Sequence, residues 1–143
     1  MPFLGRLASI ALLCVSLIAC RSAEARAREA EAARLAQAID ALRNAPNEGK
    51  APLLAALERN ECVHPKACEL KQTCVAAYRL LESARSASAR ARDLLAERDG
   101  GPAAAIAAAG EVNRAESELL RAGDLTERCA TSQGRLLRES RAR

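Results

Sequence analysis

The sequence predicts an all-α protein, a small helical bundle built on one long antiparallel helical hairpin, stapled by disulfides and preceded by a helical stalk. Aromatic residues are almost absent, with one Tyr, one Phe and no Trp. Ala, Arg, Glu and Leu dominate, and all four are good helix formers. Glycine and proline gather in a few short stretches that separate long helix-forming segments. A core so poor in large side chains would gain from disulfides.

The first residues have the pattern of an export signal. Arg6 supplies a positive charge, and residues 7–19 are uncharged and rich in Leu, Ile, Val and Ala. This run is too short for a membrane-spanning helix, which needs roughly 20 apolar residues because the hydrocarbon core is about 30 Å thick. Charged residues follow at once, beginning with Arg21. Residues 1–19 are therefore predicted to be a signal peptide, and Cys14 would be removed with it.

The end of this signal, Leu17-Ile18-Ala19-Cys20, closely resembles the lipobox of bacterial lipoproteins. The resemblance implies cleavage before Cys20, a diacylglycerol on its sulfur and usually an acyl chain on its amine. Several acyl chains would form a lasting anchor, because each buried CH₂ contributes about 0.8 kcal/mol. Arg21 stands where an Asp often retains such proteins in the inner membrane. The resemblance thus favours the outer membrane, facing the periplasm, with the inner membrane or the cell surface as alternatives.

The alternative interpretation is a plain signal peptide, or an uncleaved short anchor, with Cys20 at this position by chance. In either case the resemblance says nothing about the fold of the rest of the chain.

Residues 20–34 are predicted to form the lipidated Cys and a charged helical stalk or linker, and residues 35–143 a helical domain. Ala alternates with Arg and Glu before Leu35, and this part has no apolar face. Leu35, Ile39 and Leu42 are spaced four and three apart, so they share one face of a helix.

A short helix is predicted between two loops. The first loop, residues 44–49, contains Pro46 and Gly49. Pro52 is expected in the first turn of the helix, where a missing amide costs little. Residues 60–66 form the second loop. The apolar side of this helix consists of Leu53, Leu54 and Leu57.

Two long helices follow, predicted over residues 65–98 and 103–139. The stretch between them, Asp99-Gly100-Gly101-Pro102, has the composition of a tight turn. A kink or a new helix is expected at Asp124, which forms a capping box with the glutamate three residues later.

The two long helices fit one antiparallel register, in which Cys74 faces Cys129, Leu95 faces Ala108 and the turn falls between Gly101 and Pro102. Large residues face small ones, so the helices could approach closely. Each helix carries an uncharged stripe at the alternating three–four spacing of a coiled coil. The stripes are residues 74, 77, 81, 84, 88, 91 and 95, and residues 108, 112, 115, 119, 122, 126 and 129.

Four cysteines follow Cys20, and an even number in an exported chain predicts two disulfides. Cys68 and Cys74 are not expected to pair, because six helical residues rise about 9 Å and a disulfide needs Cα atoms within about 7 Å. The register favours Cys74–Cys129, which leaves Cys62–Cys68 to close the loop before the long helix.

No catalytic, cofactor or metal site is expected. Zinc accepts thiolate and imidazole ligands, but the spacing of Cys62, His64, Cys68 and Cys74 matches no specific zinc motif. His64, the only histidine, is expected to be exposed in a loop, with no Ser–His–Asp arrangement around it. Tyr78 is predicted to lie in the core, with a partner groove as the alternative.

The charge balance gives no excess of the kind that nucleic-acid binding needs, since 22 Lys and Arg stand against 18 Asp and Glu. Arg135, Arg138, Arg141 and Arg143 form a basic C-terminal end. It is interpreted as complementing a helix dipole, with contact to anionic envelope polymers or lipid phosphates as the alternative.

The expected function is that of a non-enzymatic structural or protein-interaction module, held in the bacterial envelope by lipid, whose partner is another envelope protein. No nucleic-acid partner and no small-molecule substrate are expected. The second hypothesis is a module that binds anionic cell-wall or lipopolysaccharide groups through its Arg-rich faces. The third is an enzyme or metal protein centred on His64 and the cysteines.

Overall fold

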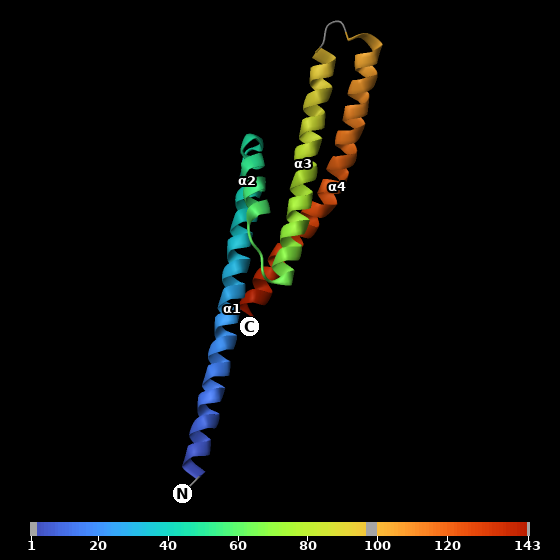
Figure 1. The fold of residues 1–143 in the computed structure, drawn as a ribbon. Coiled ribbons are helices and arrows are strands. Elements are labelled where there is room, and N and C mark those ends of the chain that lie inside the picture. The colour runs from blue at the N-terminus through green and yellow to red at the C-terminus, as the bar shows by residue number, and fades with distance from the viewer. Residues whose placement is uncertain (1–2, 97–99, 143) are drawn as a thin grey trace.

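Four helices make up the protein, in the order α1 (Phe3–Asn44), α2 (Asn47–Arg59), α3 (Pro65–Ala96) and α4 (Gly101–Arg141). The computed structural model describes residues 3–96 and 100–142, with side chains from residue 23 onward, and the described residues contain no strand. Figure 1 shows α3 and α4 as a long hairpin, with α1 and α2 packed beside its lower half. The predicted fold class, a small disulfide-stapled helical bundle, is confirmed.

Helix α1 runs without a break through the segment that was expected to be a stalk or a linker. The side chains of the predicted signal peptide, residues 1–19, and of Cys20 lie outside the described part of the chain. Burial begins at Glu31 and Ala32, shortly before the predicted start of the domain at residue 35. Where side chains are described, none of the helices has a segment with the length and apolar character to cross a membrane.

The core lies where all four helices meet. Leu35, Ile39 and Leu42 share the buried face of α1, as predicted, with exposed fractions of 3%, 0% and 0%. Tyr78 is only 4% exposed, which confirms that it belongs to the core. The buried cluster consists of Leu35, Ile39, Leu42, Leu54, Leu57, Ala67, Leu70, Cys74, Val75, Tyr78 and Cys129.

Helix α2 begins earlier than predicted. Pro46 is its N-cap, in an extended conformation with φ −62° and ψ 157°, and Pro52 lies inside the helix instead of in its first turn. The prediction of a loop as far as residue 49 was therefore wrong. The Lys50 ammonium donates to the carbonyls of Leu42 and Arg43 at the end of α1, at 3.0 and 3.1 Å. This contact ties the first turn of α2 to α1, which local sequence did not indicate.

Helix α4 is continuous, so the predicted kink or new helix at Asp124 is wrong. Ala122 and Cys129, one before and one after this point, are both buried against the hairpin partner, at 0% and 1% exposure. Packing along the whole helix therefore outweighs the local preference of a capping sequence. Gly101 opens α4 with a φ of 53°, a conformation that favours glycine. Residues 97–99 of the predicted turn and helix end lie outside the described residues.

The hairpin seam follows the predicted register at its small residues and at Leu81, which packs against the core, and departs from it at three other large residues. Leu95, Val112 and Leu119 are 64%, 42% and 49% exposed, and Ala87 is buried where Ser88 was expected. Since only small side chains lie between the helices, the leucine and valine side chains are displaced to the flank. The buried seam alanines are Ala77, Ala84, Ala87 and Ala91 of α3 and Ala108, Ala115 and Ala122 of α4.

Candidate functional site

Two disulfides join Cys62 to Cys68 and Cys74 to Cys129, with Cα–Cα distances of 5.3 and 5.0 Å. These are the pairs that the sequence predicted. Cys74 and Cys129 are 0% and 1% exposed, so their bond lies in the core and fixes the two long helices to each other. Among the described residues, no group of three or more His, Cys, Asp or Glu side chains is placed to hold a metal ion.

A buried carboxylate holds the loop between α2 and α3. Glu31 of α1 is 7% exposed, and its Oε1 accepts the backbone N–H of Val63 at 2.6 Å. Its Oε2 lies 3.5 Å from Nε2 of His64, whose backbone N–H also points at the carboxylate. The His64 side chain is 25% exposed. The expectation that His64 is exposed was therefore wrong. Glu31 belongs to a part of α1 that has no apolar face in the sequence, yet it is buried beside the histidine.

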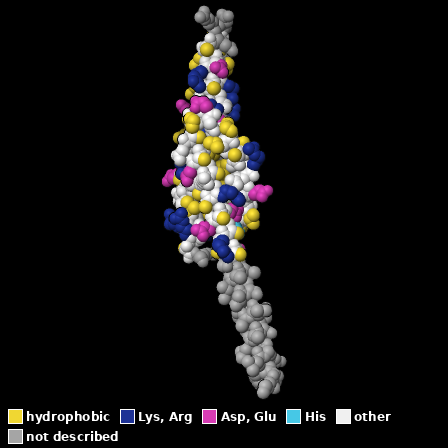
Figure 2. Space-filling view, turned by 90° about the vertical axis from the view of Figure 1, so that its left-hand side faces the viewer, with side chains coloured by type: hydrophobic (Ala, Val, Ile, Leu, Met, Phe, Trp, Pro, Cys, Tyr) yellow, Lys and Arg dark blue, Asp and Glu magenta, His cyan; other side chains and the backbone are white. Residues whose placement is uncertain are grey.

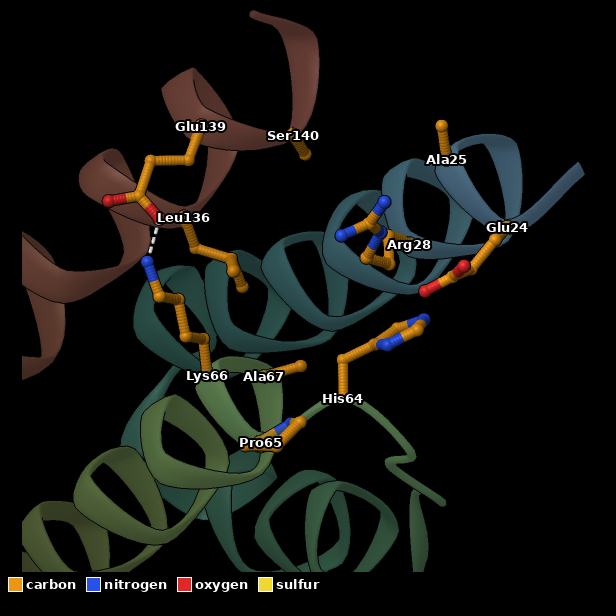
Figure 3. Close-up of a pocket in the computed structure, with 10 residues that line it drawn as sticks. All are labelled: Glu24, Ala25, Arg28, His64, Pro65, Lys66, Ala67, Leu136, Glu139 and Ser140. Carbon is orange, nitrogen blue, oxygen red and sulfur yellow. Dashed lines mark hydrogen bonds and ion pairs between the residues drawn. The ribbon is translucent and has the colours of Figure 1, made fainter. Parts of the chain in front are cut away.

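A pocket of about 410 Å³, here called the base pocket, lies next to this loop. Figure 3 shows that three segments surround it: the middle of α1, the start of α3 and the end of α4. Sequence reasoning missed this pocket because these segments are far apart in the chain. Its lining consists of Glu24, Ala25, Arg28, His64, Pro65, Lys66, Ala67, Leu136, Glu139 and Ser140.

The base pocket has one ion pair on one side and separate charged groups on the other. Nζ of Lys66 lies 2.6 Å from Oε2 of Glu139, and Figure 3 shows His64 facing Glu24 and Arg28 across the opening. The Ser140 hydroxyl donates to the carbonyl of Leu137 at 3.0 Å, so it is not hydrogen-bonded to the imidazole. The arrangement thus provides charged binding groups beside an apolar wall.

The basic C-terminal residues belong to the same end of α4 as Leu136, Glu139 and Ser140 of this pocket. Arg135, Arg138 and Arg141 are exposed on the last turns of α4, and Arg143 lies outside the described residues. Arg135 lines a smaller hollow of about 90 Å³, which shares Lys66, Leu136 and Glu139 with the base pocket. Figure 2 shows that basic and acidic side chains alternate along the face it presents, with hydrophobic side chains gathered in the middle.

A second candidate surface is the distal hairpin, defined as residues 82–96 of α3 and 101–121 of α4. In Figure 1 its upper part extends beyond α1 and α2. Six large apolar side chains among the described residues are strongly exposed, and all but Val63 belong to the distal hairpin. They are Leu95, Ile106, Val112, Leu119 and Leu120, at 64%, 74%, 42%, 49% and 76% exposure.

One flank of the distal hairpin is closed by polar contacts between the helices. Nη2 of Arg90 lies 2.9 Å from Oε2 of Glu111, and Oγ of Ser83 donates to Oε1 of Glu118 at 2.9 Å. Val112 directly follows Glu111, so it lies about 100° further round the helix. Leu119 directly follows Glu118 in the same way. Val112 and Leu119 therefore lie on the flank of the seam opposite to these polar contacts.

These polar contacts perturb both carboxyls. The hydrogen bond from Arg90 holds the pKa of Glu111 below its usual value. The hydrogen bond from Ser83, followed by that from Arg114, lowers the pKa of Glu118 in the same way. The side chains of Glu111 and Glu118 are 25% and 14% exposed, so water screens these contacts only in part.

No protein-family model, curated protein or solved structure matches this chain.

Proposed function

We propose that this protein is a lipid-anchored bacterial envelope protein that acts as a non-enzymatic interaction module and presents its distal hairpin to another envelope protein. The observation that carries this proposal is the concentration of exposed large apolar side chains on the distal hairpin. Large apolar side chains that are exposed together in one region of a protein are typical of sites that bind other proteins. The base supplies a disulfide-stapled support from which the hairpin extends.

The proposed location is supported by two features. The lipobox resemblance at residues 17–20 implies acylation of Cys20, and Arg21 favours the outer membrane, facing the periplasm. Two disulfides agree with an exported protein, because disulfides persist in oxidising compartments such as the bacterial periplasm.

The interaction is tested by charge substitutions on the distal hairpin. Leu95→Glu and Leu120→Glu are expected to abolish co-purification of the partner after cross-linking in intact cells. Neither side chain is buried, so thermal unfolding and membrane fractionation should not change. Val63→Glu is the matched control, since Val63 is 81% exposed and lies outside the hairpin. The proposal is wrong if the hairpin variants retain the same cross-linked partner as the control.

The anchor is tested by mass spectrometry of the N-terminal peptide of membrane-extracted protein. A peptide that begins at Cys20 and carries diacylglycerol and an acyl chain is expected, and Cys20→Ser should prevent this modification. An unmodified Cys20 thiol, or recovery of the chain as reduced cytosolic material, would overturn the anchor.

A second candidate function is the binding of anionic cell-wall or lipopolysaccharide groups by the basic end of α4. It is favoured by the position of Arg135 beside the base pocket, close to Lys66. Arg135→Glu combined with Arg138→Glu and Arg141→Glu is expected to remove salt-sensitive binding to purified envelope polymers. Unchanged binding by this variant would exclude the second candidate.

A further inference from the structure

The mouth of the base pocket offers one acidic and one basic group from the same helix. Glu24 and Arg28 are separated by one helical turn, so they lie on the same face of α1. Within the described part of the protein, neither side chain forms an ion pair. Figure 3 shows both of them at the opening, on the side away from the Lys66–Glu139 pair. Both are thus available to a ligand.

The wall of the pocket is apolar. Ala25, Pro65, Ala67 and Leu136 line it, and Leu136 also packs against the core. The volume of about 410 Å³ falls in the range of pockets that hold small ligands, roughly 300–1,000 Å³. An alkyl chain would gain from burial against such a wall.

We propose that the base pocket binds a membrane phospholipid with a zwitterionic head group, one that carries a phosphate and a primary amine. The guanidinium of Arg28 donates to the phosphate, a strong charge-assisted contact. The Glu24 carboxylate accepts from the ammonium, and the adjoining alkyl chain lies along Leu136 and Ala67. Phosphatidylglycerol has the same phosphate but no ammonium for the Glu24 carboxylate, so the site prefers the zwitterionic head group.

The source of the ligand rests on the proposed function. Glu24 lies four residues after Cys20 in a continuous helix, about 6 Å along its axis. Acyl chains on Cys20 would hold the pocket at the level of the lipid head groups. The bilayer that holds the anchor thereby supplies the ligand.

The test uses the chain purified from membranes and placed in phosphatidylglycerol nanodiscs. One arm contains a trace of photoreactive phosphatidylethanolamine, the other the same amount of photoreactive phosphatidylglycerol. After irradiation, adducts are mapped by peptide mass spectrometry. We expect adducts within residues 24–28, 64–67 and 136–140, with about five-fold more from the phosphatidylethanolamine probe.

Two pairs of variants separate the head-group contacts from general surface charge. Glu24→Gln should remove the preference between the two probes, and Arg28→Gln should reduce labelling by both. Glu116→Gln and Arg121→Gln are the matched controls, because both residues are exposed on α4 outside the pocket, and they should leave labelling unchanged.

A third pair tests the volume of the pocket. Ala25→Trp narrows the opening without touching the core, and it should suppress labelling by both probes. Ala109→Trp, at an exposed position on the distal hairpin, is its control. Helical content and thermal unfolding are measured on all variants, so that a loss of labelling is compared only among folded proteins.

Equal labelling by the two probes would overturn the head-group assignment. Adducts spread along the hairpin without enrichment at the pocket would overturn the site itself. The same digest reports on Cys20. An acylated Cys20 with an unlabelled pocket refutes this inference alone, whereas an unmodified Cys20 with a labelled pocket refutes the anchor alone.

Discussion

At the scale of single residues, Tyr78 reports on the core. It is the only tyrosine, there is no tryptophan, and Nζ of Lys50 lies 5.9 Å from the centre of its ring. Burial raises the pKa of its phenol, an effect that Arg43 partly opposes. The stability that this burial contributes is fully present below about pH 10, the ordinary pKa of tyrosine, and is lost as the pH rises through the higher folded-state pKa.

We therefore expect the absorbance titration of Tyr78 to have a higher midpoint in native protein than in urea. Unfolding should become easier above about pH 10, because the unfolded state ionises first. The single tyrosine makes the absorbance signal unambiguous. A native midpoint at or below the denatured one would contradict the buried position.

Gln133 is a buried polar residue that joins the end of α4 to α1. Its Nε2 donates to Oδ1 of Asp40 at 3.0 Å and lies 3.3 Å from the Ala36 carbonyl. Its Oε1 accepts from Nη2 of Arg43 at 2.7 Å. The sequence did not indicate this role, because Gln133 lies after Cys129, the last residue of the predicted stripe. Its hydrogen-bond partners also lie about 90 residues earlier in the chain.

Replacing Gln133 with Leu should lower the free energy of unfolding by about 1–3 kcal/mol, because Nη2 of Arg43 loses its acceptor and Asp40 keeps only its bond to Nη1 of Arg43. Urea denaturation followed by circular dichroism measures the change. Gln72→Leu, at an exposed position of α3, serves as the control and should be close to neutral. Equal effects of the two substitutions would show that the network does not stabilise the fold.

At the scale of elements, the two disulfides should differ in what they contribute. Cys74–Cys129 joins residues 55 apart, while Cys62–Cys68 joins residues 6 apart. In the chain-entropy model the longer loop gives about 4 kcal/mol and the shorter about 2 kcal/mol. Double alanine variants of each pair, compared by urea denaturation, should reproduce this order. A larger loss from the short loop would contradict it.

Acid should weaken the distal hairpin. The pKa values of Glu111 and Glu118 are lowered by hydrogen bonds from Arg90 and Ser83, respectively. Groups with a depressed pKa contribute stability above their ordinary pKa, and that stability is lost as the pH falls through the folded-state value. Amide hydrogen exchange at decreasing pH should therefore show the distal hairpin losing protection as Glu111 and Glu118 become protonated.

Arg90→Gln is the specific check on this acid sensitivity. It should return the pKa of Glu111 toward its usual value in carboxyl NMR titration and leave the lowered pKa of Glu58, which depends on Arg79, as it is. A shift of both carboxyls would show that the effect is not local.

The elements were predicted well where the pattern is periodic and poorly where packing decides. Heptad spacing of Ala with Cys74 and Cys129 gave the register and the main disulfide. The capping sequence at Asp124 predicted a break in the helix. The helix continues instead, because residues on both sides of Asp124 are buried against α3. Leu95 was placed in the seam because it is large and uncharged, but tight contact between alanines leaves no room for it.

At the scale of the whole molecule, the candidate sites differ in how far sequence could find them. The exposed apolar residues of the distal hairpin lie in one stretch of the chain. The predicted register, however, placed several of them in the buried seam between the helices. The base pocket depends on α1, α3 and α4 meeting at one end, and no spacing within the chain encodes that meeting. Of the residues around the two hollows, the sequence singled out His64, in the base pocket, and Arg135, in the smaller hollow.

The position of the long disulfide has a consequence for proteolysis. Every arginine of the distal hairpin lies between Cys74 and Cys129, so a single tryptic cut there yields two pieces that remain covalently joined. Such a nicked protein would migrate as two bands only after reduction. A protease could therefore cut the distal hairpin without detaching either half from the base.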